Sequence, residues 1–151
     1  MTQQEGLTPA LSAAQMRRRE LRAALVSLED AVSAAARTGV EWRAQVVARL
    51  EDLRQAFEHH AADTEGPGGL YEEMQTLAPH LSDKAQRLRE EHPQLRAAID
   101  GAIADTARID PAGVDEARSA LETLMIRLVR HRQRGADLIW EAYMVDVGGS
   151  D

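Results

Sequence analysis

The sequence contains no cysteine, and this absence removes several kinds of site at once. Disulfides, thiolate metal centres and cysteine nucleophiles are all excluded. No apolar stretch approaches the ~20 residues that a membrane-spanning helix needs, and the first residues lack a signal-peptide profile. We therefore expect a soluble, cytoplasmic protein that does not bind a membrane.

Positive charge is also scarce, since 18 Lys and Arg stand against 25 Asp and Glu, giving a net charge of −7. Proteins that bind nucleic acid neutralise phosphates with a concentrated basic surface. The one basic run here, Arg17–Arg19, is followed at once by Glu20. We predict no nucleic-acid partner. Phosphate-binding loops and glycine–serine nucleophile motifs are missing as well, and we expect no enzymatic activity.

Apolar residues recur every three or four positions in four long segments, which is the spacing of helices with one buried face. The helices are expected to begin at Pro9, about Glu41, Pro79 and Pro111. Thr8 supplies a capping hydroxyl for the first helix, and Gly39 is expected to end it in a left-handed conformation. Residues 70–77 predict a short connecting helix. Pro93 predicts a kink in the third long helix.

Tight turns join the first helix to the second and the third to the fourth, so neighbouring helices should run antiparallel. We predict an all-α, up-down-up-down four-helix bundle in one domain over residues 8–146, with flexible termini at 1–7 and 147–151. Trp140, Tyr143 and Met144 are expected to pack against the connecting helix, or else to form a dimer contact. Monomer and homodimer therefore both stay open.

Three histidines lie on the inward faces of three different predicted helices: His60, His92 and His131. Counting the helical rise from the turns places His60 and His131 at a similar height, roughly 30 Å along their helices. His92 falls within about 10 Å of that level, and Arg18 is the inward residue of the first helix there. The three imidazoles are expected to converge, with Arg18 closing the fourth side. His59 and His80 fall off the inward faces and are expected at the surface.

Two interpretations of this convergence stay open. Three imidazoles suit one zinc ion, or one iron ion if carboxylates join them. Glu65 is the nearest carboxylate, and the other candidates are Glu72, Glu73, Asp137 and Glu141. Alternatively, no metal is bound and the imidazoles form hydrogen bonds to one another, to Arg18, to Tyr71 or to a carboxylate.

The order of these residues resembles the hemerythrin family of four-helix, cation-binding bundles. The resemblance rests on a histidine after Phe57, on Leu-Arg-Glu-Glu-His at residues 88–92 and on Leu-Val-Arg-His at residues 128–131. It spans the chain from about Met16 to Tyr143. Members of this family bind two irons through five histidines and two bridging carboxylates, and many carry or sense oxygen.

The resemblance implies seven ligand positions, and three of them keep a histidine: His60, His92 and His131. Arg18 replaces the histidine of the first helix, and Leu88 replaces a second histidine of the third helix. Thr64 and Gly135 stand where the bridging carboxylates are expected. Two nearby metal ions would then repel each other without compensation, so a di-iron oxygen carrier is not expected.

The sequence therefore leads to two functional hypotheses. The first is a divergent hemerythrin-like protein with a reduced, mononuclear metal site made by the three histidines and Glu65, acting in metal binding or redox sensing. The second is a metal-free bundle used as a small-ligand, anion-binding or protein-interaction module. In the second case Arg18 would bind the anion.

Overall fold

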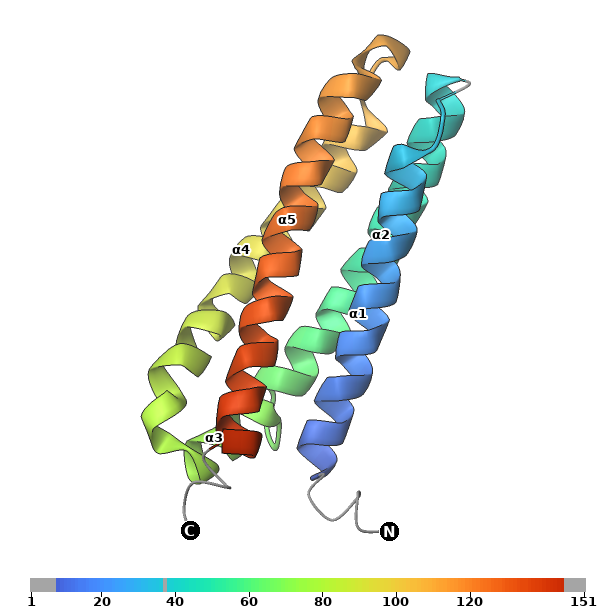
Figure 1. Ribbon diagram of the computed structural model, residues 1–151. Helices are drawn as coiled ribbons and strands as arrows, with labels where there is room; N and C mark the ends of the chain where they lie inside the picture. The colour runs from blue at the N-terminus through green and yellow to red at the C-terminus, as the bar shows by residue number, and fades with distance from the viewer. Residues whose placement is uncertain (1–7, 37, 146–151) are drawn as a thin grey trace.

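Four long helices of 25–27 residues stand side by side, and each runs antiparallel to the next (Figure 1). The computed structural model describes residues 8–36 and 38–145. The long helices are α1 (Pro9–Ser33), α2 (Gly39–Glu65), α4 (Ser82–Ala107) and α5 (Val114–Ile139). No strand occurs among these residues, so the prediction of an all-α four-helix bundle is confirmed for them. The expected flexible termini lie outside the described residues.

Shorter elements link the long helices or, in one case, follow the last of them. They are α3 (Leu70–Leu77), the 3-10 turns η2 (Pro79–Leu81) and η3 (Pro111–Gly113), and the π-helical turn η4 (Trp140–Val145). The α3 helix lies at the end where α1 begins and α5 ends (Figure 1). At the predicted starts Pro79 and Pro111 the chain forms a 3-10 turn, and the α-helix follows directly after it. α4 continues through Pro93 as one helix.

Threonine side chains set the starts of α1 and α2. The hydroxyl of Thr8 accepts a hydrogen bond from the backbone N–H of Leu11 at 3.1 Å, as predicted. Thr38 does the same for Glu41, also at 3.1 Å. Each bond satisfies an N–H group that the helix itself leaves without a partner.

The predicted role of Gly39 was wrong. α1 already ends at Ser33, and Gly39 is the first residue of α2 with an ordinary backbone conformation. Among the described residues, only Gly68 has a left-handed conformation, with φ of 71°. Glycine is needed at position 39 because a Cβ atom there would lie 2.5 Å from Cα of Pro111. Gly39 therefore brings the two interhelical turns together.

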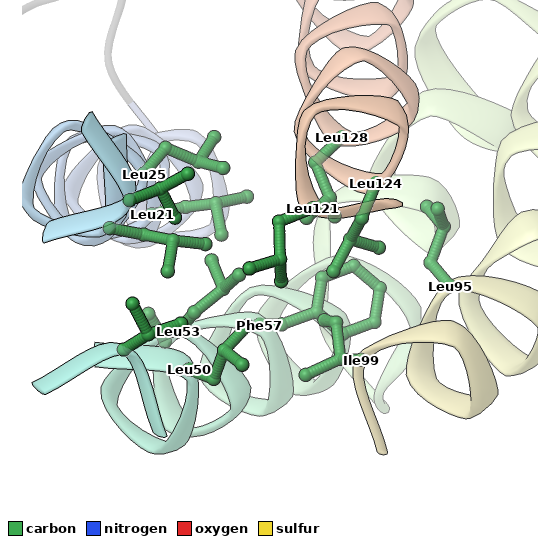
Figure 2. Close-up of a cluster of buried hydrophobic side chains, with 14 of the residues drawn as sticks. Leu21, Leu25, Leu50, Leu53, Phe57, Leu95, Ile99, Leu121, Leu124 and Leu128 are labelled. Carbon is green, nitrogen blue, oxygen red and sulfur yellow. The ribbon is translucent and has the colours of Figure 1, made fainter. Parts of the chain in front are cut away.

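An apolar core fills the bundle over most of its length, with leucines from all four long helices pointing inward (Figure 2). Fully burying one such side chain stabilises the fold by about 1.5–3 kcal/mol. Because only one face of each helix is apolar, none of the described helices is long and apolar enough to cross a membrane. Phe57 is the one phenylalanine of this core and lies among its leucines (Figure 2). A second apolar cluster, which includes Leu11, Met74, Leu88 and Leu138, lies under α3.

The last described turn of the chain packs toward α3 through the buried Ala142 and through Tyr143. The Tyr143 hydroxyl donates a hydrogen bond to Oε2 of Glu73 at 2.5 Å, and the Thr8 hydroxyl donates to the same oxygen at 2.6 Å. The prediction that Trp140 and Met144 also pack there was wrong, since they are 59% and 58% exposed. These two residues are one turn apart on the outer face of η4, whereas Tyr143 is turned toward α3.

Candidate metal centre

The three predicted histidines meet in a polar layer between the two apolar clusters. His60, His92 and His131 are 5%, 0% and 2% exposed. One ring nitrogen of each lies within 4.8 Å of the others. The ring centroids are 5.0–5.4 Å apart. The convergence predicted from helix heights is therefore confirmed, and this group can hold a metal ion.

Two aromatic rings enclose the layer. Phe57, one turn before His60 on α2, has its ring centroid 5.6–6.2 Å from those of all three imidazoles. Tyr71 of α3 stacks on His92 from the other side, at 6.1 Å with an angle of 24° between the planes. Burial raises the pKa of the Tyr71 hydroxyl above its usual value, so this ring stays neutral. The imidazoles are thus shielded from water both on the core side and on the α3 side.

Two carboxylates fix the orientation of two of the imidazoles. Nδ1 of His92 donates to Oε2 of Glu65 at 3.0 Å, and Nδ1 of His131 donates to Oε1 of Glu91 at 2.9 Å. An ionised carboxylate only accepts hydrogen bonds, so both Nδ1 atoms carry the proton. The lone pairs of these rings are therefore on Nε2. A carboxylate behind a histidine in this manner is the usual arrangement around a bound metal ion.

The remaining ring nitrogens are not fully satisfied by the protein. Nε2 of His60 lies 3.3 Å from Nε2 of His131 and, since the latter holds a lone pair, His60 is the donor. Nδ1 of His60 and Nε2 of His92 are then lone pairs, and both are buried without a hydrogen-bond partner among the described atoms. Leaving such a group unsatisfied costs about 1–3 kcal/mol. A cation that accepts lone pairs would relieve this cost.

The surroundings keep the imidazoles neutral. Burial lowers the pKa of His60 well below its usual value of 6.5, and the nearby His92 and His131 lower it further. Burial also lowers the pKa values of His92 and His131, although the hydrogen bonds to Glu65 and Glu91 oppose it. Metal ligation requires the neutral imidazole, so at neutral pH a metal ion would displace few protons from these rings.

Arg18 of α1 lies on the fourth side of the layer, as predicted. Its NH1 group donates a hydrogen bond to the backbone carbonyl of Arg132 at 3.0 Å. A Cβ atom on Gly135 would lie 3.3 Å from the same NH1 group. The charge of Arg18 contributes to the lowered pKa of His60. The missing side chain at position 135 therefore leaves the space that the guanidinium uses.

The positions at which the hemerythrin pattern is broken supply no further ligand. The hydroxyl of Thr64 donates to the backbone carbonyl of His60 at 2.9 Å. Leu88 belongs to the apolar cluster under α3, and Gly135 has no side chain. Glu65 accepts a hydrogen bond from Nδ1 of His92, on the side of the ring away from the cluster, and is not part of the three-nitrogen group.

The other acidic residues considered from the sequence are engaged elsewhere. Glu72 accepts from the backbone of Gly68, Glu73 from Tyr143, Asp137 from Gln133 and Glu141 from Lys84. His80 is exposed, and His59 is only partly buried and hydrogen-bonded to Glu20 at 2.8 Å, so both lie outside the cluster as expected.

Glu91 is the residue that the sequence did not reveal. It precedes His92 by one position, so it points about 100° away from the inward face of α4 and toward α5. There it accepts hydrogen bonds from His131 and, at 2.5 Å, from Arg134. Although burial alone raises the pKa of Glu91, these bonds lower it overall and keep it ionised. The sequence did contain a signal for this role, because Glu91 is an acidic residue next to an inward histidine and faces the neighbouring helix.

The fold and this geometry define a class of protein: an all-α four-helix bundle with a buried cluster of three neutral histidines. Comparison with protein-family models, with characterised proteins and with solved structures found no match for the chain. The resemblance to hemerythrins therefore rests on the residues themselves.

Proposed function

We propose that this chain is a divergent hemerythrin-like protein that binds one transition-metal ion through His60, His92 and His131. The observation that carries the proposal is the pair of buried lone pairs, on His60 and His92, that no donor satisfies. A polar layer built only for packing would be expected to satisfy its own hydrogen bonds. Its role would be metal binding or redox sensing.

The donor set fits zinc or iron. Two nitrogens bound to the same tetrahedral zinc ion are separated by about 3.3 Å. One ring nitrogen from each of the three histidines lies within 4.8 Å of the others, so modest shifts of the side chains bring them to this spacing. Zinc would make the site structural, whereas iron would allow it to respond to oxidants. In either case Glu65 and Glu91 hold the protons of the outer nitrogens, and Phe57 and Tyr71 limit the access of water.

One ion fits this set better than two. A second ion would need its own donors and a bridging anion to reduce the repulsion between the metal charges. Thr64, Leu88 and Gly135 give none of these at the positions where the family has them. Arg18 adds a further positive charge on the same side. We therefore do not propose a di-iron oxygen carrier.

Metal analysis of the untagged protein, purified without chelator, tests the proposal. After reconstitution with Zn²⁺, or with Fe²⁺ under anaerobic conditions, we expect about one equivalent of metal per chain. The His131→Gln variant should lose most of it, whereas His80→Gln, at an exposed position, should retain it. Less than about a tenth of an equivalent in the wild type would refute the metal site.

Two further measurements distinguish this proposal from a di-iron site and from a metal-free binding module. A strong visible absorption after iron reconstitution and subsequent exposure to air would indicate an oxo-bridged ferric pair and contradict a single ion. The second candidate, a metal-free binding module, is favoured by the direct hydrogen bond between His60 and His131. It predicts that Zn²⁺ leaves the melting temperature unchanged. Binding at 100 times the Kd would instead stabilise the fold by about 2.7 kcal/mol.

A further inference from the structure

Three arginines gather where α1 and α5 face each other, beside the histidines. Burial, and then the charge of Arg132, lower the pKa of Arg18. Burial, and then the charge of Arg22, lower the pKa of Arg132. The positive charges therefore lie close enough to repel one another. Within the part of the chain that the structure describes, no Asp or Glu forms an ion pair with any of the three.

This arrangement contrasts with four arginines that link two helices through a carboxylate: Arg17 with Asp63, Arg54 with Asp100, Arg96 with Glu58 and Arg134 with Glu91. Arg43 and Arg118, like Arg18, donate to backbone carbonyls of another segment. Arg18 has only a backbone carbonyl, and Nε of Arg132 is buried without a partner among the described atoms. Arg18 and Arg132 are partly buried and Arg22 is exposed. A partly desolvated cation without a counter-charge is costly, so this place in the fold favours an anion.

The net charge of the metal site also favours an anion beside Arg18. A divalent ion and Arg18 carry three positive charges, whereas Glu65 and Glu91, the carboxylates bonded to the histidines, carry two negative charges. Glu91 is also shared with Arg134. At least one positive charge therefore remains uncompensated in a largely buried layer. An anion with one negative charge would balance it.

The guanidinium is suited to an oxyanion in particular. It has five N–H donors in a planar fork that matches the two oxygens of a carboxylate. The structure records one hydrogen bond for it, from NH1 to the carbonyl of Arg132. Gly135, one turn after His131 on α5, gives the guanidinium room to lie against α5, since a Cβ atom there would be 3.3 Å from NH1. Three histidines also leave at least one coordination position of a metal ion for an outside ligand.

Resting on the metal site proposed above, we infer that a small carboxylate-type oxyanion binds between the metal ion and Arg18. One oxygen would occupy the position that the histidines leave, and the guanidinium of Arg18 would hold the anion. The ligand class is a monoanion with two oxygens on one carbon, of which acetate and bicarbonate are the simplest members. Arg18 is thus the residue that selects the anion, whereas the histidines hold the metal.

Titration of the protein with Co²⁺ tests the inference, because the visible bands of Co²⁺ report its coordination. The titration is run in acetate and in chloride at equal ionic strength. In the wild type, acetate should change the bands and lower the Kd for Co²⁺ by about tenfold or more. The Arg18→Gln variant should still bind Co²⁺ but lose the difference between acetate and chloride. Arg18→Lys, which keeps the charge without the fork, should show a smaller effect of acetate.

The matched control is Arg19→Gln, which removes the same charge from an exposed position next in the chain. It should behave as the wild type does. Equal bands and equal Kd in acetate and chloride for the wild type would overturn the anion site while leaving the metal site intact. An acetate effect that persists in both Arg18 variants would also overturn it. Absence of Co²⁺ binding in every buffer would refute the metal site and, with it, this inference.

Discussion

Lowering the pH from about 7.5 to about 5.5 is expected to destabilise the metal-free protein, because its three buried imidazoles stay neutral only in the folded state. Burial lowers the pKa values of His60, His92 and His131 below the usual 6.5. Above that value both the folded and the unfolded chain hold them neutral. Below it the unfolded chain takes up protons that the folded chain does not, so stability is lost as the pH falls.

The size of the effect follows from the number of protons. For an imidazole that stays neutral throughout, the free energy of unfolding falls by about 1.4 kcal/mol over this range. His60, whose pKa is lowered well below 6.5, should contribute all of this amount. The three histidines together set an upper limit of about 4 kcal/mol, a large part of the 5–15 kcal/mol typical of a small domain. Burial raises the pKa values of Glu20 and Glu91, but their hydrogen bonds lower them overall. These two groups therefore reduce stability only as the pH falls below about 4.5, outside the range tested here.

Urea denaturation at several pH values, with a chelator present, measures this effect. Replacement of His60 by leucine should remove about 1.4 kcal/mol of the pH dependence. The His80→Gln variant, changed at an exposed position, should keep all of it. A free energy of unfolding that changes by less than about 0.5 kcal/mol between the two pH values would refute the claim that the folded protein holds the imidazoles neutral.

Two further predictions concern the outer carboxylate and the glycines. Replacing Glu91 by glutamine should weaken Zn²⁺ binding by about 10–100-fold in a competition assay, because His131 loses its charged acceptor; the same change at the exposed Glu90 should leave the affinity unaltered. In urea denaturation, Gly101→Ala should stabilise the protein by about 0.5–1 kcal/mol, because its Cβ would meet no atom within 4 Å. Gly39→Ala should destabilise it, because its Cβ would lie 2.5 Å from a proline Cα. A change of the same sign at both glycines would contradict the packing described around them.

The helices were predictable from the sequence because their signals are local. Apolar spacing, the Thr8 hydroxyl and the prolines before the third and fourth long helices depend on residues a few positions apart. The role of Gly39 was not predictable, since it depends on contact with Pro111, a residue far along the chain. Trp140 and Met144 were placed wrongly because they lie on the outer face of the last turn, and the sequence pattern does not show which face of that turn meets α3.

The candidate site was predictable as a set of inward histidines but not as a network. Helix length alone brought His60, His92 and His131 to one level. Glu65 was predicted near the site as a candidate metal ligand, but its bond to His92 was not predictable, and Glu91 was not predicted at all. Each lies off the inward face of its own helix and accepts a hydrogen bond from a histidine of a neighbouring helix. Whether such a side chain turns toward the site or toward solvent is decided by packing, which the sequence pattern does not contain.

The energetics of the polar layer also bear on whether it is merely a remnant of a lost site. Apolar residues of similar size would fill this part of the core without the cost of desolvating imidazoles, and such replacements are often neutral or stabilising. Instead, two lone pairs stay unsatisfied at about 1–3 kcal/mol each. Two half-buried carboxylates are bonded to the opposite sides of the rings. Gly135 and Arg18 fit one another, since a side chain at the first would crowd the guanidinium of the second. Arrangements that cost stability and are mutually adjusted are expected where a ligand repays the cost, which supports a working metal site over a relict.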